Sequence, residues 1–127
     1  MNENKKMVSK SFEDLLVWQK AHAFVLEVYR ITKESPKEEL YVLTSQFRNS
    51  ARSVPSNIAE GYKKRGKADK LRFFNIAQGS LEESRYYVIL SRDLGYINQE
   101  KYLELLKQVI DISQLLNSYC NAISKSI

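Results

Sequence analysis

The sequence predicts an all-α fold, an antiparallel up-down-up-down four-helix bundle. Apolar side chains recur every three or four residues through four stretches of roughly 20 residues, which is the period of helices that bury one face. Short polar segments separate these stretches, and short connections favour antiparallel neighbours. No stretch alternates apolar and polar residues as a half-buried strand does. The length of 127 residues fits one domain with its own core.

The first ten residues are predicted to be a flexible N-terminal arm, and residues 11–127 the bundle. Residues 1–10 are polar and show no helical repeat of apolar side chains. Ser11 and Asp14 then have the spacing of a capping box, which marks the start of a helix. The apolar repeat that follows predicts a first helix that runs to about Lys33.

The second helix is predicted to start at Ser35 and Pro36, with Glu38 bonding back to the helix start. Its apolar repeat continues straight through Pro55. A proline inside a helix removes one backbone hydrogen bond, so we expect a kink or a local break there. Gly61 is expected to end this helix in the left-handed conformation.

The third helix is predicted to run from Ala68 to Gly95, and Asn98 is predicted to cap the fourth. The apolar band of the third helix is too wide for a single packing seam. We therefore expect part of it to form a contact between subunits, where small side chains let another backbone come close: Ala77, Gly79, Ser80 and Ser84. The alternative is that these small residues pack inside one bundle and admit a large side chain of a neighbouring helix.

Polar residues gather around the internal proline. Asn57, Glu60 and Gly61 follow Pro55, and Glu83 lies one helix away. Two carboxylates would suit an acid/base pair, but no nucleophile or electrophile accompanies them. We interpret these residues as a polar network that braces the kink and satisfies the carbonyl freed by the proline, and we predict no enzymatic activity.

Positive charge is concentrated between residues 48 and 72. Eight cations lie there against Glu60 and Asp69, whereas the whole chain carries a net charge of +5. In the predicted topology the turn between the second and third helices shares one end of the bundle with both termini. The lysines of residues 63–67 are therefore expected to gather there with Lys5, Lys6, Lys10 and Lys125. We predict that the cations neutralise nucleic-acid phosphates: Arg48, Arg52, Lys63, Lys64, Arg65, Lys67, Lys70 and Arg72.

Two alternatives concern these same residues. Tyr62 and Phe73 are candidates for stacking on unpaired bases. Alternatively, the lysines only solvate a turn, while Arg48 and Arg52 pair with helix carboxylates.

Several kinds of site are excluded by composition. One Cys allows no internal disulfide, and one His with no Glu three residues before it cannot build the di-metal site of some helical bundles. We therefore predict no metal and no cofactor. His22 is expected to be partly buried, and Cys120 to be a small core or interface residue. No secretory leader or membrane span is present in the sequence, so a cytoplasmic protein is expected.

Two segments carry a resemblance to a known family: Pro-Ser-Asn-Ile-Ala-Glu-Gly at residues 55–61 and Phe-Phe-Asn-Ile-Ala-Gln-Gly-Ser-Leu-Glu-Glu at residues 73–83. The chain resembles, over nearly its whole length, the four-helix-bundle proteins encoded in intervening sequences of bacterial 23S rRNA genes, often labelled a ribosomal protein. The same bundle is shared with the accessory protein of diversity-generating retroelements. That resemblance implies a ring-like homo-oligomer, in particular a homopentamer, and a non-catalytic role with nucleic acid.

The functional hypothesis is a non-enzymatic homo-oligomer that binds RNA or DNA phosphates through a basic surface. The alternative is a scaffold or adaptor with a protein partner, whose basic surface docks a nucleic-acid enzyme such as a reverse transcriptase.

Overall fold

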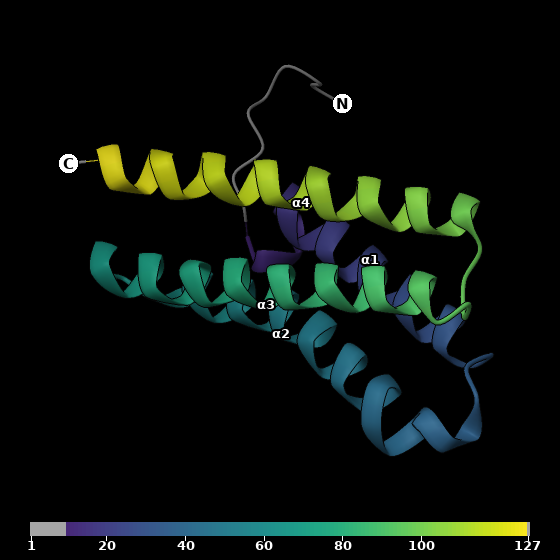
Figure 1. Cartoon of the computed structure of the whole chain (residues 1–127). Helices are drawn as coiled ribbons and strands as arrows, with labels where there is room; N and C mark the ends of the chain where they lie inside the picture. Colours follow the sequence, from purple (N-terminus) through teal and green to yellow (C-terminus); the bar gives the residue numbers. More distant parts are fainter. Residues whose placement is uncertain (1–9, 127) are drawn as a thin grey trace, which may run out of the picture.

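The predicted four-helix bundle is confirmed. A computed structural model describes residues 10–126, and over these residues it contains four long helices and no strand. The helices are α1 (Leu16–Thr32), α2 (Ser45–Lys63), α3 (Lys67–Asp93) and α4 (Gln99–Lys125). Each helix packs against the next in the chain, and α4 also packs against α1, which closes the bundle (Figure 1). The predicted arm lies outside the described residues except for Lys10, which is exposed.

The hydrophobic core draws on all four helices. Its side chains sit at the helical repeat that the sequence predicts, and a set of them is fully buried: Val17, Phe24, Val28, Phe47, Val54, Ile58, Leu105, Ile112 and Leu116. Cys120 packs at the edge of this core, and burial raises the pKa of its thiol. No helix within residues 10–126 is both long and apolar enough to cross a membrane.

The N-terminal capping box forms as predicted, but it caps a single 3-10 turn, η1 (Phe12–Asp14), rather than α1. Leu15 then adopts an extended conformation, with φ −78° and ψ 128°, so α1 starts only at Leu16. On α1, His22 is exposed, which corrects the expectation that it is partly buried. Its ring stacks on Trp18 with centroids 5.0 Å apart.

The segment before α2 is less regular than predicted. The N-cap residue is Pro36 rather than the predicted Ser35, and the turn that follows is a 3-10 turn, η2 (Lys37–Glu39), with no side-chain capping bond. A π-helical turn, η3 (Leu40–Thr44), follows, and α2 begins only at Ser45. A π-turn widens the hydrogen-bonded ring and changes the helical register. In this register Leu43 and Thr44 are buried, and three neighbouring apolar side chains are exposed: Leu40, Tyr41 and Val42.

The internal proline does not break α2. The helix is continuous from Ser45 to Lys63 with Pro55 buried inside it. Figure 1 shows α2 changing direction along its length, its N-terminal part oblique to α3 and its C-terminal part alongside α3. This shape agrees with the predicted kink, and the alternative of a local break is wrong.

The contact between α2 and α3 is made by small residues. Ser50 and Ser84 are buried with their Oγ atoms 2.9 Å apart, and the Oγ atoms of Ser53 and Ser80 are 2.7 Å apart. Ala77 is also fully buried here. Ala77 and Ser84 are buried within the chain, so the expectation that they contact another subunit is wrong, and packing within one bundle is confirmed for them. Ser80 is only partly buried and Gly79 is exposed, so for these two residues a contact between subunits stays a prediction.

Gly61 serves this same contact instead of ending a helix. Its φ is not positive, and α2 continues to Lys63, so the predicted left-handed helix end is wrong. An ideal Cβ at Gly61 would meet ring atoms of Phe74. The left-handed glycine of the described chain is Gly95, with φ 80°, which follows α3 as predicted. Asn98 caps α4 as predicted and accepts a hydrogen bond from the Lys101 N–H at 2.8 Å.

Candidate nucleic-acid interface

The lysine-rich turn lies beside the end of α4. Lys67, the first residue of α3, donates from Nζ to the carbonyl oxygens of Ser124 at 3.3 Å and Ser126. A lysine at these carbonyls complements the negative end of the α4 dipole. The prediction that the turn shares one end of the bundle with the C-terminus is therefore confirmed.

The start of α1 does not reach that end. Leu16 lines a shallow pocket with Leu115 and Ser118 of α4, whereas α4 continues to Lys125. At 1.5 Å per residue, about 10 Å of α4 therefore extends beyond α1. Figure 1 shows the C-terminal part of α4 continuing past the start of α1. Lys10 lies next to η1 and so does not join the turn, which corrects the prediction for that lysine. Lys5 and Lys6 lie outside the described residues.

We call this part of the bundle the basic tip; it comprises the last turn of α2, the connecting residues 64–66, the first two turns of α3 and the last two turns of α4. Two of its cations lie against one aromatic ring. The guanidinium carbon of Arg72 is 4.5 Å from the Phe73 ring centroid, and Lys64 Nζ is 5.0 Å from it. Phe73 therefore positions cations in this structure, a role that the sequence analysis did not anticipate for it.

Lys70 closes the end of α2. Its Nζ donates to the carbonyl oxygens of Tyr62 at 2.7 Å and Gly61 at 3.2 Å, and lies 5.6 Å from the Tyr62 ring centroid. Burial lowers the pKa of Lys70. Lys70 thus has a structural role at a helix C-terminus, where a cation is favoured by the dipole.

The charge of the basic tip is barely compensated. Carbonyl oxygens and aromatic rings stabilise cations without neutralising them. Among residues 10–126, the ion pair at the tip joins Arg72 to Asp69, with 3.8 Å between Nε and Oδ1 and both side chains about 60% exposed. Such an exposed, long pair contributes little. Lys63 and Arg65 are exposed to solvent. The tip is therefore a cationic surface.

Arg48 and Arg52 lie away from the tip, so the predicted set of eight cations is divided in two. Arg48 precedes Lys63 by 15 residues of helix, which is about 22 Å. Arg48 Nε donates to Thr32 Oγ1 at 2.8 Å, and Arg52 Nη1 donates to Tyr29 Oη at 2.7 Å. Both partners belong to α1 and neither is a carboxylate, so the alternative of ion pairing with helix carboxylates is wrong for these two arginines.

The predicted polar network around Pro55 forms only in part. Asn57 Nδ2 donates to the Ser53 carbonyl at 2.7 Å and to Ser53 Oγ at 3.0 Å, not to the carbonyl of Ala51 that the proline frees. Glu83 accepts a hydrogen bond from Tyr87 Oη at 2.9 Å, and burial together with this hydrogen bond raises the pKa of Tyr87. Glu60 is exposed, and no bond within the described residues joins it to Glu83.

Residues 13–118 match the sequence model of a family described as 23S rRNA-intervening sequence protein. The chain belongs to this family. It is also similar to the crystal structure of a protein with unknown function from the S23 ribosomal protein family of Bacteroides thetaiotaomicron VPI-5482. That match has a TM-score of 0.77 and 26% identity, and it covers 84% of this chain and 96% of the other. A comparison with curated proteins gives no match.

The matched region of this 23S rRNA-intervening sequence protein contains all eight predicted cations and both motifs that carried the resemblance. The last seven described residues of α4, which follow Ser118, lie beyond it. Ser124, one of the two residues whose carbonyl groups Lys67 binds, is among them, and Ser126 follows them. Within the described part of the chain, no three His, Cys, Asp or Glu side chains come together as metal ligands would.

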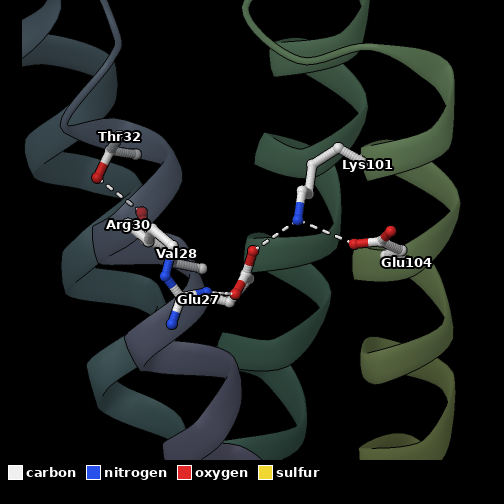
Figure 2. Close-up of polar contacts among 6 residues, drawn as sticks. All are labelled: Glu27, Val28, Arg30, Thr32, Lys101 and Glu104. Carbon is white, nitrogen blue, oxygen red and sulfur yellow. Dashed lines mark hydrogen bonds and ion pairs between the residues drawn. The ribbon is translucent and has the colours of Figure 1, made fainter.

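A feature of this family member that the sequence analysis missed lies between α1 and α4, toward the end opposite the tip. The Glu27 carboxylate accepts from Lys101 Nζ at 2.8 Å and from Arg30, and Lys101 also binds Glu104 at 2.9 Å, as Figure 2 shows. The sequence signal is weak, because Glu27 and Lys101 are 74 residues apart. This network pairs Arg30 and Lys101 with carboxylates, whereas the ion pair at the basic tip is the long, exposed one between Arg72 and Asp69.

Proposed function

We propose that this protein is a non-enzymatic, homo-oligomeric nucleic-acid-binding protein that binds RNA or DNA phosphates through its basic tip. The observation that carries the proposal is the gathering of five cations around the connection between α2 and α3: Lys63, Lys64, Arg65, Lys67 and Arg72. Within residues 10–126, the ion pair found at the tip is the weak one between Arg72 and Asp69. Each phosphate that a cation neutralises releases counterions, so binding falls steeply as salt rises.

Assembly would multiply this effect. Several tips presented together raise the effective concentration of cations along one strand. The homopentamer implied by the family resemblance is the assembly that we propose. Large apolar side chains that are exposed on three of the helices are available for subunit contacts: Leu16, Leu26, Ile76, Tyr86, Leu103 and Ile110. Light scattering measures the mass in solution, and a monomer would contradict this part of the proposal.

Binding is tested by titrating mixed-sequence RNA and DNA at two salt concentrations. The test variant changes Lys63, Lys64 and Arg65 to Gln and leaves Lys67 and Lys70 in place for their structural contacts. The matched control changes Lys20, Lys33 and Arg85 to Gln, which removes the same charge from exposed positions elsewhere. We expect the test variant to lower the slope of log affinity against log salt by about 2 for single strands.

The control is expected to change that slope little. Equal loss in the two variants would show that only total charge matters, not the tip. Absence of binding by the wild type at low salt would contradict the proposed function and favour the adaptor alternative.

A further inference from the structure

Arg48 and Arg52 occupy consecutive turns of α2 and share one concave surface. They line an open pocket of about 280 Å³ between α1, η3 and α2, together with Tyr29, Tyr41 and Asn49. We propose that this pocket binds one phosphate and the adjacent unpaired base of a single-stranded nucleic acid. The inference rests on the proposed nucleic-acid function and gives it a second site and a preferred substrate, single strands over duplexes.

One tyrosine positions both arginines. Arg52 Nη1 donates to Tyr29 Oη at 2.7 Å, and the guanidinium carbon of Arg48 lies 4.5 Å from the centroid of the Tyr29 ring. Asn49 Oδ1 accepts a further hydrogen bond from Arg52 Nη2. Side chains held in place before binding lose less conformational freedom when a ligand arrives.

Arg48 is also oriented by a buried residue at the end of α1. Its Nε donates to Thr32 Oγ1 at 2.8 Å, and the Thr32 hydroxyl donates its own proton to the Val28 carbonyl at 2.7 Å. Thr32 is buried, so this acceptor is fixed. The terminal nitrogens of Arg48 make no hydrogen bond within residues 10–126, which leaves the planar donor pair that suits phosphate.

No negative charge offsets the pair. The lining of the pocket contains no carboxylate, and neither arginine forms an ion pair with a residue of the described chain. Two like charges four residues apart on a helix repel each other. An anion between them removes this repulsion, and a phosphate group therefore complements the pocket.

An exposed aromatic ring adds the preference for single strands. Tyr41 is 88% exposed although it lines the same pocket. An aromatic ring beside cations is the arrangement on which unpaired bases stack, because each base has a π face and its phosphate lies nearby. In a duplex the bases are already stacked on one another, so Tyr41 has no base to receive.

Fluorescence anisotropy with labelled oligouridylate and with a duplex of equal length tests the site. Arg48→Gln/Arg52→Gln is expected to weaken single-strand binding at least tenfold at low salt. Tyr41→Ala is expected to weaken single-strand binding at least fivefold and to leave duplex binding within twofold. Lys20→Gln/Arg85→Gln removes the same charge from exposed positions and is expected to stay within twofold of the wild type.

Folding is checked by circular dichroism melts. Arg48→Lys/Arg52→Lys keeps the charge, and it is expected to fold and to bind less well than the wild type, because a lysine lacks the planar donor pair. One outcome is that the arginine variants bind single strands as tightly as the Lys20→Gln/Arg85→Gln control, while the Lys63/Lys64/Arg65 variant loses binding. That outcome would overturn the proposal for the pocket and leave the proposed function standing. If the wild type binds no nucleic acid at low salt, both are overturned. If a phosphoserine peptide displaces the oligouridylate at equal concentration, the pocket belongs to a protein partner and the inference is wrong.

Discussion

An ideal Cβ atom at Gly61 would lie 2.9 Å from both Cδ1 and Cε1 of Phe74. It would also lie 3.1 Å from Cβ of Phe73. Phe74 is 2% exposed, so its ring is enclosed and has little room to move. The closeness of α2 and α3 next to the basic tip therefore depends on the absence of a side chain at residue 61.

Gly61→Ala is expected to destabilise the protein by about 1 to 3 kcal/mol, as overpacking in a core does. Gly79→Ala is the matched control, because Gly79 lies on α3 with no atom within 4 Å of its ideal Cβ. This control is expected to raise stability by up to about 1 kcal/mol, since alanine is the better helix former. Urea unfolding measures both. Equal stability of the two variants would contradict the packing argument.

The buried hydroxyls of Ser50 and Ser84 are expected to be coupled. Their Oγ atoms are 2.9 Å apart, so one hydroxyl donates its proton to the other. The accepting hydroxyl can donate its own proton to a carbonyl of its own helix, which is Phe47 O for Ser50 or Ser80 O for Ser84. Removing one hydroxyl leaves the other less satisfied, at a cost of about 1 kcal/mol. Ser50→Ala/Ser84→Ala is expected to cost less than the two single changes together, as measured by a double-mutant cycle. Strict additivity would mean that the two hydroxyls do not interact.

Glu27 is expected to matter more than Glu104, although both bind Lys101. The Glu27 side chain is 17% exposed and contacts two cations, whereas the Glu104 side chain is 57% exposed. Glu27→Gln is expected to cost about 1 kcal/mol, and Glu104→Gln less than about 0.5 kcal/mol, because solvent screens the exposed pair. Chemical unfolding at low salt compares them. A larger loss for Glu104→Gln would contradict the ranking.

Tyr96 links stability to alkaline pH. Its hydroxyl donates to Glu39 Oε2 at 2.6 Å, and this hydrogen bond, with burial and the nearby negative charge, raises the pKa of Tyr96. The folded state therefore favours the protonated phenol. This contribution is complete below the unfolded pKa of about 10 and is lost as pH rises through the folded pKa.

Tyr96→Phe is expected to be less stable than the wild type at pH 7, and the gap is expected to narrow above pH 10. Tyr87, whose pKa is also raised, is present in both proteins and cancels from the comparison. Urea unfolding from pH 7 to pH 11 measures the gap. A gap that stays constant over this range would exclude the linkage.

The bundle was predictable from local signals, and its irregular entry was not. Each of these signals depends on a few neighbouring residues, and the structure contains each of them: the apolar spacing, the Ser11 capping box, Gly95 and Asn98. The π-turn at 40–44 interrupts the helical register before α2, and no residue type in this segment marks it. For the same reason, the extended Leu15 was not foreseen within an unbroken apolar repeat.

The sequence was enough to predict the excess of positive charge at the candidate site, but not the arrangement of its side chains in space. The sequence identifies the cations, and the topology brings the turn to the C-terminus through Lys67. The separation of Arg48 and Arg52 from the turn follows from helix length alone and was available from the sequence. Their neutral partners Thr32 and Tyr29 were not, because they come from another helix.

The unequal helix lengths have a mechanical consequence. With 17 residues in α1 against 27 in α3 and in α4, the rod is four helices thick over one part and three over the tip. A region with fewer packed helices unfolds locally at a lower free energy. Local fluctuations are therefore expected to concentrate at the basic tip, where the lysines lie. Cations on a more flexible part of the bundle can adjust their positions to uneven spacing between phosphates. This property suits the proposed binding of a polyanion without recognition of its base sequence.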